Sequence, residues 1–145
     1  MNKEHNYLIW IARISVSLVF LFNIQSALIF LIRPELFMGA YELSGEVGQA
    51  TIRGIGILFL MWNVTYPWVI KNPIKHIIIY HIVLLQSLIG IIGESWIFFT
   101  IRDSTPVLAE SIQRFILFDG IGFIIMLIPF ILILFRSNYL HIKDK

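Results

Sequence analysis

Residues 77–101 read IIIYHIVLLQSLIGIIGESWIFFTI, and Glu94 carries the only formal charge in this stretch. A helix needs about 17 to 25 mostly apolar residues to cross the hydrocarbon core of a bilayer, so the stretch is long enough to span one. Three other stretches, near residues 7–32, 54–70 and 115–135, have the same character. The whole chain is 58% hydrophobic and 14% charged, with a mean hydropathy of +0.83. We therefore expect transmembrane helices rather than a soluble domain.

Turn signals separate these stretches. Asn72 and Pro73 favour a tight turn, and Thr105 followed by Pro106 is typical of a helix start. Residues 33–50 mix apolar side chains with three glutamates and three glycines, which indicates an interfacial loop or short helix over one mouth of a bundle. The predicted fold is all-α and a single domain over residues 1–145. It is a four-transmembrane-helix bundle with antiparallel up-down topology and helices near 7–32, 50–70, 75–101 and 106–136.

The distribution of basic residues predicts the orientation, because loops rich in Lys and Arg stay in the cytoplasm. The other side carries Arg33 and Arg102 beside five acidic residues. Both termini are therefore expected to be cytoplasmic, in a multi-pass protein of the cell membrane. Membrane lipids are the expected surroundings, and topology explains the basic face better than nucleic acid does. The side with both termini holds Lys3, Lys71, Lys75, Arg136, Lys143 and Lys145.

Arg53, Glu94 and Asp119 are ionisable residues inside the predicted transmembrane helices. A charge inside a membrane costs several kcal/mol unless it is paired or hydrated, so such residues face the bundle interior and mark a functional site. Residues equally far from a turn lie at equal depth in an antiparallel pair. Counting from turns near residues 73–74 and 106–107 predicts that all three share one layer in the outer half of the membrane.

Neutral polar residues extend this predicted layer. Gln86, Gly90 and Glu94 follow one face of a helix. Asn23 and Gln25 lie in the outer half of the first helix, and Arg114 lies about one turn outside Asp119. The candidate ligand-binding residues are Arg53, Glu94, Asp119, Arg114, Gln25, Asn23 and Gln86.

The charges also permit a purely structural interpretation, in which Arg53 and Glu94 form an ion pair that fixes helix register. Two carboxylates beside one arginine then need a further explanation. Either Arg114 joins the group, or one carboxyl is held protonated by its surroundings. Arg114 can instead pair with Glu110 on the helix surface, since the two are four residues apart.

Several chemistries lack the residues that they need. The chain has no cysteine, which excludes disulfides and thiolate chemistry. Four histidines are present, but His76 and His81 are five residues apart and fall on different helix faces, while His5 and His141 lie near the termini. No metal site is predicted, and no nucleophile and base, phosphate loop or zinc spacing is visible. Whether the protein is an enzyme, and which cofactor it uses, is left open by the sequence.

The run RGIGILFL at residues 53–60, after a first helix led by Arg13 and a loop with Pro34, resembles the small four-helix membrane proteins of the DoxX-like superfamily. The glycine-rich third helix with Gly90, Gly93 and Glu94 is compatible with that resemblance. It implies a four-helix membrane fold. For some members it implies a link to quinone-dependent oxidation of sulfur compounds, and for a eukaryotic branch a role in receptor assembly. The absence of cysteine argues against a dithiol role here.

These observations lead to one functional hypothesis and two alternatives. The hypothesis is a charged pocket in the outer half of the bundle that binds a small polar or amphiphilic ligand, such as a quinone-like molecule. Arg53 would hold an anionic or carbonyl group, and Glu94 and Asp119 would orient it or exchange protons. The alternatives are a non-catalytic accessory or assembly protein whose charges only lock the bundle, and an oligomeric channel or transporter. A homo-oligomer is compatible with each.

Overall fold

All regular secondary structure in the described part of the chain is helical, which confirms the all-α prediction. The computed structural model describes the backbone of residues 3–143 and the side chains of residues 6–136. Four segments are long and apolar enough to cross a membrane, namely Asn6–Ile32, Gly45–Lys71, Ile77–Ile101 and Pro106–Arg136. The helices are α1 (Lys3–Ile32), α2 (Glu35–Met38), the 3₁₀ helix η1 (Gly39–Tyr41), α3 (Gly45–Asn63), α4 (Tyr66–Lys71), α5 (Ile77–Ile101) and α6 (Pro106–Lys143).

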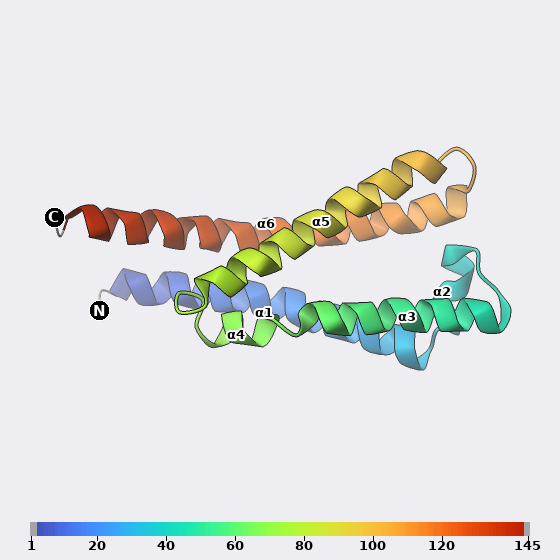
Figure 1. Ribbon diagram of the computed structural model, residues 1–145, viewed down its shortest axis with the longest axis horizontal. Coiled ribbons are helices and arrows are strands. Elements are labelled where there is room, and N and C mark those ends of the chain that lie inside the picture. Colours follow the sequence, from blue (N-terminus) through green and yellow to red (C-terminus); the bar gives the residue numbers. More distant parts are fainter. Residues whose placement is uncertain (1–2, 144–145) are drawn as a thin grey trace.

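The long helices lie roughly side by side in an elongated bundle (Figure 1). Both ends of the chain lie at one end of the bundle, called here the termini end, and α2 lies at the other, called the loop end. Helix α1 packs on α3 and on α6, and α5 packs on α6. The backbones of α3 and α5 hardly approach each other, although the Trp62 ring of α3 lies against Gly90 of α5, whereas α4 packs on α5. The bundle is therefore closed at the termini end and less tightly joined between α3 and α5 toward the loop end.

The second predicted helix, residues 50–70, differs most from the structure. It begins earlier, at Gly45, and it is divided into α3 and α4 after Asn63. Pro67 explains the break, because a proline has no N–H and its ring clashes with the carbonyl four residues earlier, which belongs to Asn63. The other three helices follow the predicted ranges closely, and α6 begins at Pro106 as predicted.

The segment between α1 and α3 forms a short helical cap at the loop end. Helices α2 and η1 lie inside the predicted interfacial region 33–50, so the short-helix form of that prediction is confirmed. Helix η1 packs on α6, and the Tyr41 ring lies 6.2 Å from that of Phe115. The chain turns back through Glu42 and Gly45, whose φ angles are 54° and 65°. The cap therefore stands next to the N-terminal part of α6.

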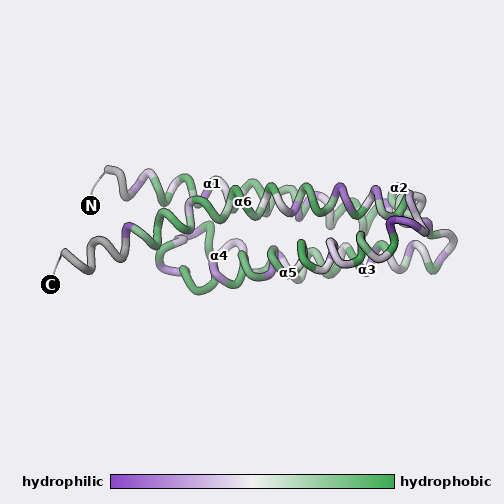
Figure 2. The backbone as a smooth tube through the Cα atoms, turned by 90° about the horizontal axis from the view of Figure 1, so that it is seen from above, coloured by the Kyte–Doolittle hydropathy of each residue, from purple (hydrophilic) through white to green (hydrophobic). Residues whose placement is uncertain are grey.

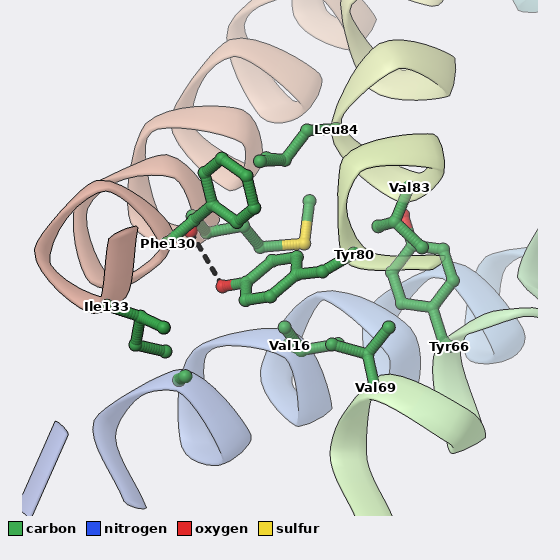
Figure 3. Close-up of a cluster of buried hydrophobic side chains, with 10 residues drawn as sticks. Val16, Tyr66, Val69, Tyr80, Val83, Leu84, Phe130 and Ile133 are labelled. Carbon is green, nitrogen blue, oxygen red and sulfur yellow. Dashed lines mark hydrogen bonds between the residues drawn. The ribbon is translucent and has the colours of Figure 1, made fainter. Parts of the chain in front are cut away.

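The main hydrophobic core lies where α1, α4, α5 and α6 meet (Figure 3). The Tyr80 hydroxyl donates a hydrogen bond of 2.7 Å to the Met126 carbonyl. This bond satisfies the buried hydroxyl. It lies within one turn of Pro129, which has no backbone N–H to donate within α6. Most of the helix length is hydrophobic, and hydrophilic segments gather near the turns (Figure 2). Other core residues are Ala12, Val16, Tyr66, Val69, Val83, Leu84, Phe130 and Ile133.

Candidate functional site

A small cavity near the middle of the bundle adjoins the core on its loop-end side. The space open to the centre of a water molecule is about 20 Å³, and about 10 to 15 Å³ is enough for one water. The cavity therefore accepts a water molecule or a group of that size, but not a whole organic ligand. All four long segments contribute to its wall, which is formed by Val19, Asn23, Phe59, Trp62, Asn63, Tyr66, Ser87, Asp119, Gly122, Phe123 and Met126.

Two asparagines form one polar side of this cavity. Asn63 is only 2% exposed, and its amide group donates a 2.7 Å hydrogen bond to the Phe59 carbonyl. The Asn23 amide group donates to the Asn63 side-chain oxygen at 3.3 Å. The second of these bonds joins α1 to the end of α3. The Asn63 amide group is therefore hydrogen-bonded although it is buried, and the two asparagines give the cavity a polar wall.

Asp119 of α6 also lines the cavity and lies against Gly90 of α5. A methyl group placed on Gly90 would lie 3.8 Å from a carboxylate oxygen of Asp119 and 2.8 Å from the Trp62 ring. Gly90 therefore lets the aspartate and the tryptophan approach α5 closely. The turn between α5 and α6 covers residues 102–105. Its centre therefore lies before residues 106–107, the turn position from which equal depth of Glu94 and Asp119 was predicted. Asp119 consequently lies nearer to Gly90 than to Glu94.

Glu94 lies one helical turn from Gly90 toward the loop end. Its side chain is partly buried, and its Oε2 atom is buried without a hydrogen-bond partner. The two carboxylates are close enough for their negative charges to repel one another. Glu94 also lies close enough to the cap to affect Tyr41. Burial raises the pKa of the Tyr41 hydroxyl to about 12, and the negative charge of Glu94 adds to this rise. Glu94 therefore stands between the cavity and the cap.

Arg53 does not join the carboxylates. Its side chain is exposed, and the ion pairs of Glu110 with Arg114 and of Arg102 with Asp103 involve neither Arg53 nor the two carboxylates. The predicted ion pair between Arg53 and Glu94 does not form in the structure. Equal depth was not sufficient, because α3 packs mainly on α1 and α5 packs mainly on α6, and the backbones of α3 and α5 hardly approach each other.

This separation predicts independent effects on stability. Arg53→Met and Glu94→Gln should change the free energy of unfolding additively, to within about 0.5 kcal/mol, because the two side chains share no contact. Unfolding of both single mutants and the double mutant in mixed micelles measures this. A coupling energy above about 1 kcal/mol would show that the two side chains interact, as an ion pair requires.

The other candidate residues fall into two groups. Arg114 pairs with Glu110, and both side chains are exposed, so the surface alternative for Arg114 is the one observed. Gln25 is also exposed, whereas Gln86 is partly buried and its Oε1 atom has no hydrogen-bond partner. Of the seven candidates, only Asn23 and Asp119 line the cavity, and Glu94 lies near it.

Several wall residues of the cavity are not among the seven candidates. Ser87 lies in the wall, although the helix face chosen from sequence passed through its neighbour Gln86. Trp62 beside Asn63 was recognisable from sequence as a pocket wall, with core packing as the commoner role, and both residues do line the cavity. Tyr66 gave no such signal, because aromatic residues near helix ends are common in membrane proteins.

Within the described side chains, no group of three or more His, Asp and Glu residues is arranged to hold a metal ion. His5 and His141 lie outside the residues whose side chains are described. Comparison of the chain with protein-family models, with curated proteins and with solved structures gives no match. The resemblance to the DoxX-like superfamily therefore stays a prediction.

Proposed function

We propose that this chain is a multi-pass membrane protein that binds a small polar or amphiphilic ligand between the cavity and the cap. Glu94 and Asp119 would receive its hydrogen-bond donors or positive charge. The observation that carries this proposal is the Oε2 atom of Glu94, which is buried without a hydrogen-bond partner. Neither carboxylate pairs with a cation among the described residues. A buried charge of this kind is costly unless a proton, water or ligand compensates it.

The charge at the site favours a donor or a cation over an anion. The sequence hypothesis assigned Arg53 to an anionic group, but Arg53 is exposed and apart from the carboxylates. An anion beside Glu94 and Asp119 would meet two negative charges. An ammonium group or a hydroxyl donor would relieve their repulsion and satisfy the free carboxylate oxygen.

The size of the cavity limits what enters it. A volume of about 20 Å³ admits a group of the size of water, so only the polar head of a ligand would fit. An apolar tail would extend toward lipid between α3 and α5, whose backbones hardly approach each other. An amphiphile with one small polar head fits both features. The accessory alternative has less support, because its proposed lock between Arg53 and Glu94 does not form.

A matched set of six-carbon compounds tests this proposal. Hexylamine should raise the melting temperature of the purified protein, whereas hexanol should act weakly and hexanoate should not act, since a ligand of the folded state stabilises it. In Asp119→Asn and Glu94→Gln, hexylamine should bind about 10- to 100-fold more weakly through loss of a charge-assisted hydrogen bond. Binding should also weaken toward pH 4, where carboxylates gain protons.

Glu110→Gln is the matched control, because this exposed glutamate lies on the same helix as Asp119. It should leave hexylamine binding unchanged. Equal stabilisation by hexylamine and hexanoate, or equal losses in Glu110→Gln and Asp119→Asn, would refute a carboxylate site.

The proposed orientation has both termini in the cytoplasm, as the excess of basic residues at the termini end supports. The chain has no cysteine, so single cysteines report on topology directly. In intact cells, a membrane-impermeant thiol reagent should label Ser104→Cys, between α5 and α6, but not Ser137→Cys, just beyond the apolar segment. Labelling of Ser137→Cys alone would reverse the orientation.

A further inference from the structure

A second feature lies at the termini end, on the outside of α1 and α4. It is a groove of about 450 Å³, far larger than the central cavity of about 20 Å³. One side is a stripe of α1 that includes Trp10, Arg13 and Ser17, and the other side is the end of α4 at Lys71. A volume of this order is typical of sites that take a small organic group.

Arg13 is the unusual residue in this groove, because it is a charged side chain within a candidate membrane segment. Its guanidinium donates a hydrogen bond to the backbone carbonyl of Lys71, the last residue of α4, and lies 5.3 Å from the centre of the Trp10 ring. This bond satisfies a carbonyl at the end of a helix, where positive charge is favourable. The Arg13 Nε atom is nevertheless buried without a hydrogen-bond partner.

The charges of the groove are all of one sign. Arg13 and Lys71 are basic, none of the lining residues is acidic, and no carboxylate pairs with either residue in the described part of the chain. Ile14 and Leu18 continue the stripe of α1 as an apolar wall that leads away from the two cations. The groove therefore has two cations, Arg13 and Lys71, at one end. The apolar wall beside them, formed by Ile14 and Leu18, is called here the apolar track.

We propose that this groove binds one anionic membrane phospholipid. Its phosphate would lie between Arg13 and Lys71, and an acyl chain would follow Ile14 and Leu18. Two cations without an acidic partner at the end of a membrane segment are complementary to a lipid phosphate. The apolar track selects a lipid over a free phosphate ion, which has no tail to place there. The site is separate from the carboxylates and does not depend on the proposed ligand.

Detergent micelles that contain either phosphatidylglycerol or phosphatidylcholine with the same acyl chains test this site. Phosphatidylglycerol should raise the melting temperature and remain bound in native mass spectra, whereas phosphatidylcholine and inorganic phosphate should do neither. Lys71→Gln should weaken phosphatidylglycerol binding about fivefold, the effect of one basic residue near the surface. It keeps the backbone carbonyl that Arg13 uses, so folding should be unaffected.

Three further variants keep the result decisive. Arg13→Gln should also weaken binding, and Ser17→Phe should block the groove while both cations remain. Lys75→Gln is the matched control, since this exposed lysine lies outside the groove and should bind phosphatidylglycerol normally. Equal stabilisation by both lipids, equal action of inorganic phosphate, equal losses in Lys75→Gln and Lys71→Gln, or a dimer that Ser17→Phe breaks would each overturn the proposal. The last outcome would assign the groove to a second copy of the chain.

Discussion

Gly56→Ala is expected to destabilise the protein by about 1 to 3 kcal/mol, because overpacking a tight contact costs this much. A methyl group on Gly56 would lie 2.9 Å from the Ala27 carbonyl oxygen and 3.1 Å from both Leu31 and Phe30. The closest of these atoms belongs to the backbone of α1 and cannot turn aside as a flexible side chain can. In lipid, close packing of this kind largely replaces the hydrophobic effect as the force that joins helices. The contact between α1 and α3 should therefore weaken.

Gly54→Ala is the matched control, two residues away on α3. A methyl group there meets no atom within 4 Å, so the change should only improve helix propensity and stabilise the protein by about 0.5 to 1 kcal/mol. Unfolding in mixed micelles should give opposite signs for the two alanines. The same sign for both would show that α1 and α3 do not approach each other closely at Gly56.

Neutralising the carboxylates should stabilise the ligand-free protein. Glu94→Gln and Asp119→Asn are each expected to raise the free energy of unfolding by about 1 to 3 kcal/mol, because each removes a partly buried and unpaired charge. The double mutant should gain less than the sum, since either single change already removes the mutual repulsion. A gain in stability at the cost of ligand binding is typical of functional sites.

The same unfolding measurement on Glu110→Gln provides the comparison. That exposed glutamate pairs with Arg114 on the surface, so its loss should change the free energy of unfolding by less than about 1 kcal/mol. Clear destabilisation by Glu94→Gln or Asp119→Asn would mean that the carboxylate holds a partner in the folded bundle, and it would favour the structural alternative over a binding site.

Most of the fold could be predicted from sequence because it depends on local properties. Apolar stretches of sufficient length gave the four long segments, and Pro106 marked the start of α6. The break after Asn63 was also within reach, since Pro67 excludes a regular hydrogen bond to that residue. The short helices α2 and η1 were foreseen only as one of two possibilities for residues 33–50.

The candidate site was predicted less well, because depth does not determine which helices touch. Counting from the turns placed Arg53 and Glu94 in one layer, yet α3 packs on α1 and leaves Arg53 exposed. Asn23 and Asp119 were among the predicted candidates and line the cavity, whereas Ser87 and Asn63 line it without having been candidates. Arg13 was noted in the sequence only as part of a resemblance, and its bond to the end of α4 depends on a residue 58 positions away.

The sequence by itself determined that this chain has four long apolar segments, that a helix begins at Pro106, and that Glu94 and Asp119 lie inside such segments. Only the tertiary structure decided the neighbours of each helix and its rotation about its own axis. The physical reason lies in the composition of the helices. A helix such as α5 is apolar on almost every side, so its few polar residues do not fix which side meets each partner. That choice depends on close fits such as Gly56 against Ala27 and Gly90 against Trp62, which exist only once the helices are packed.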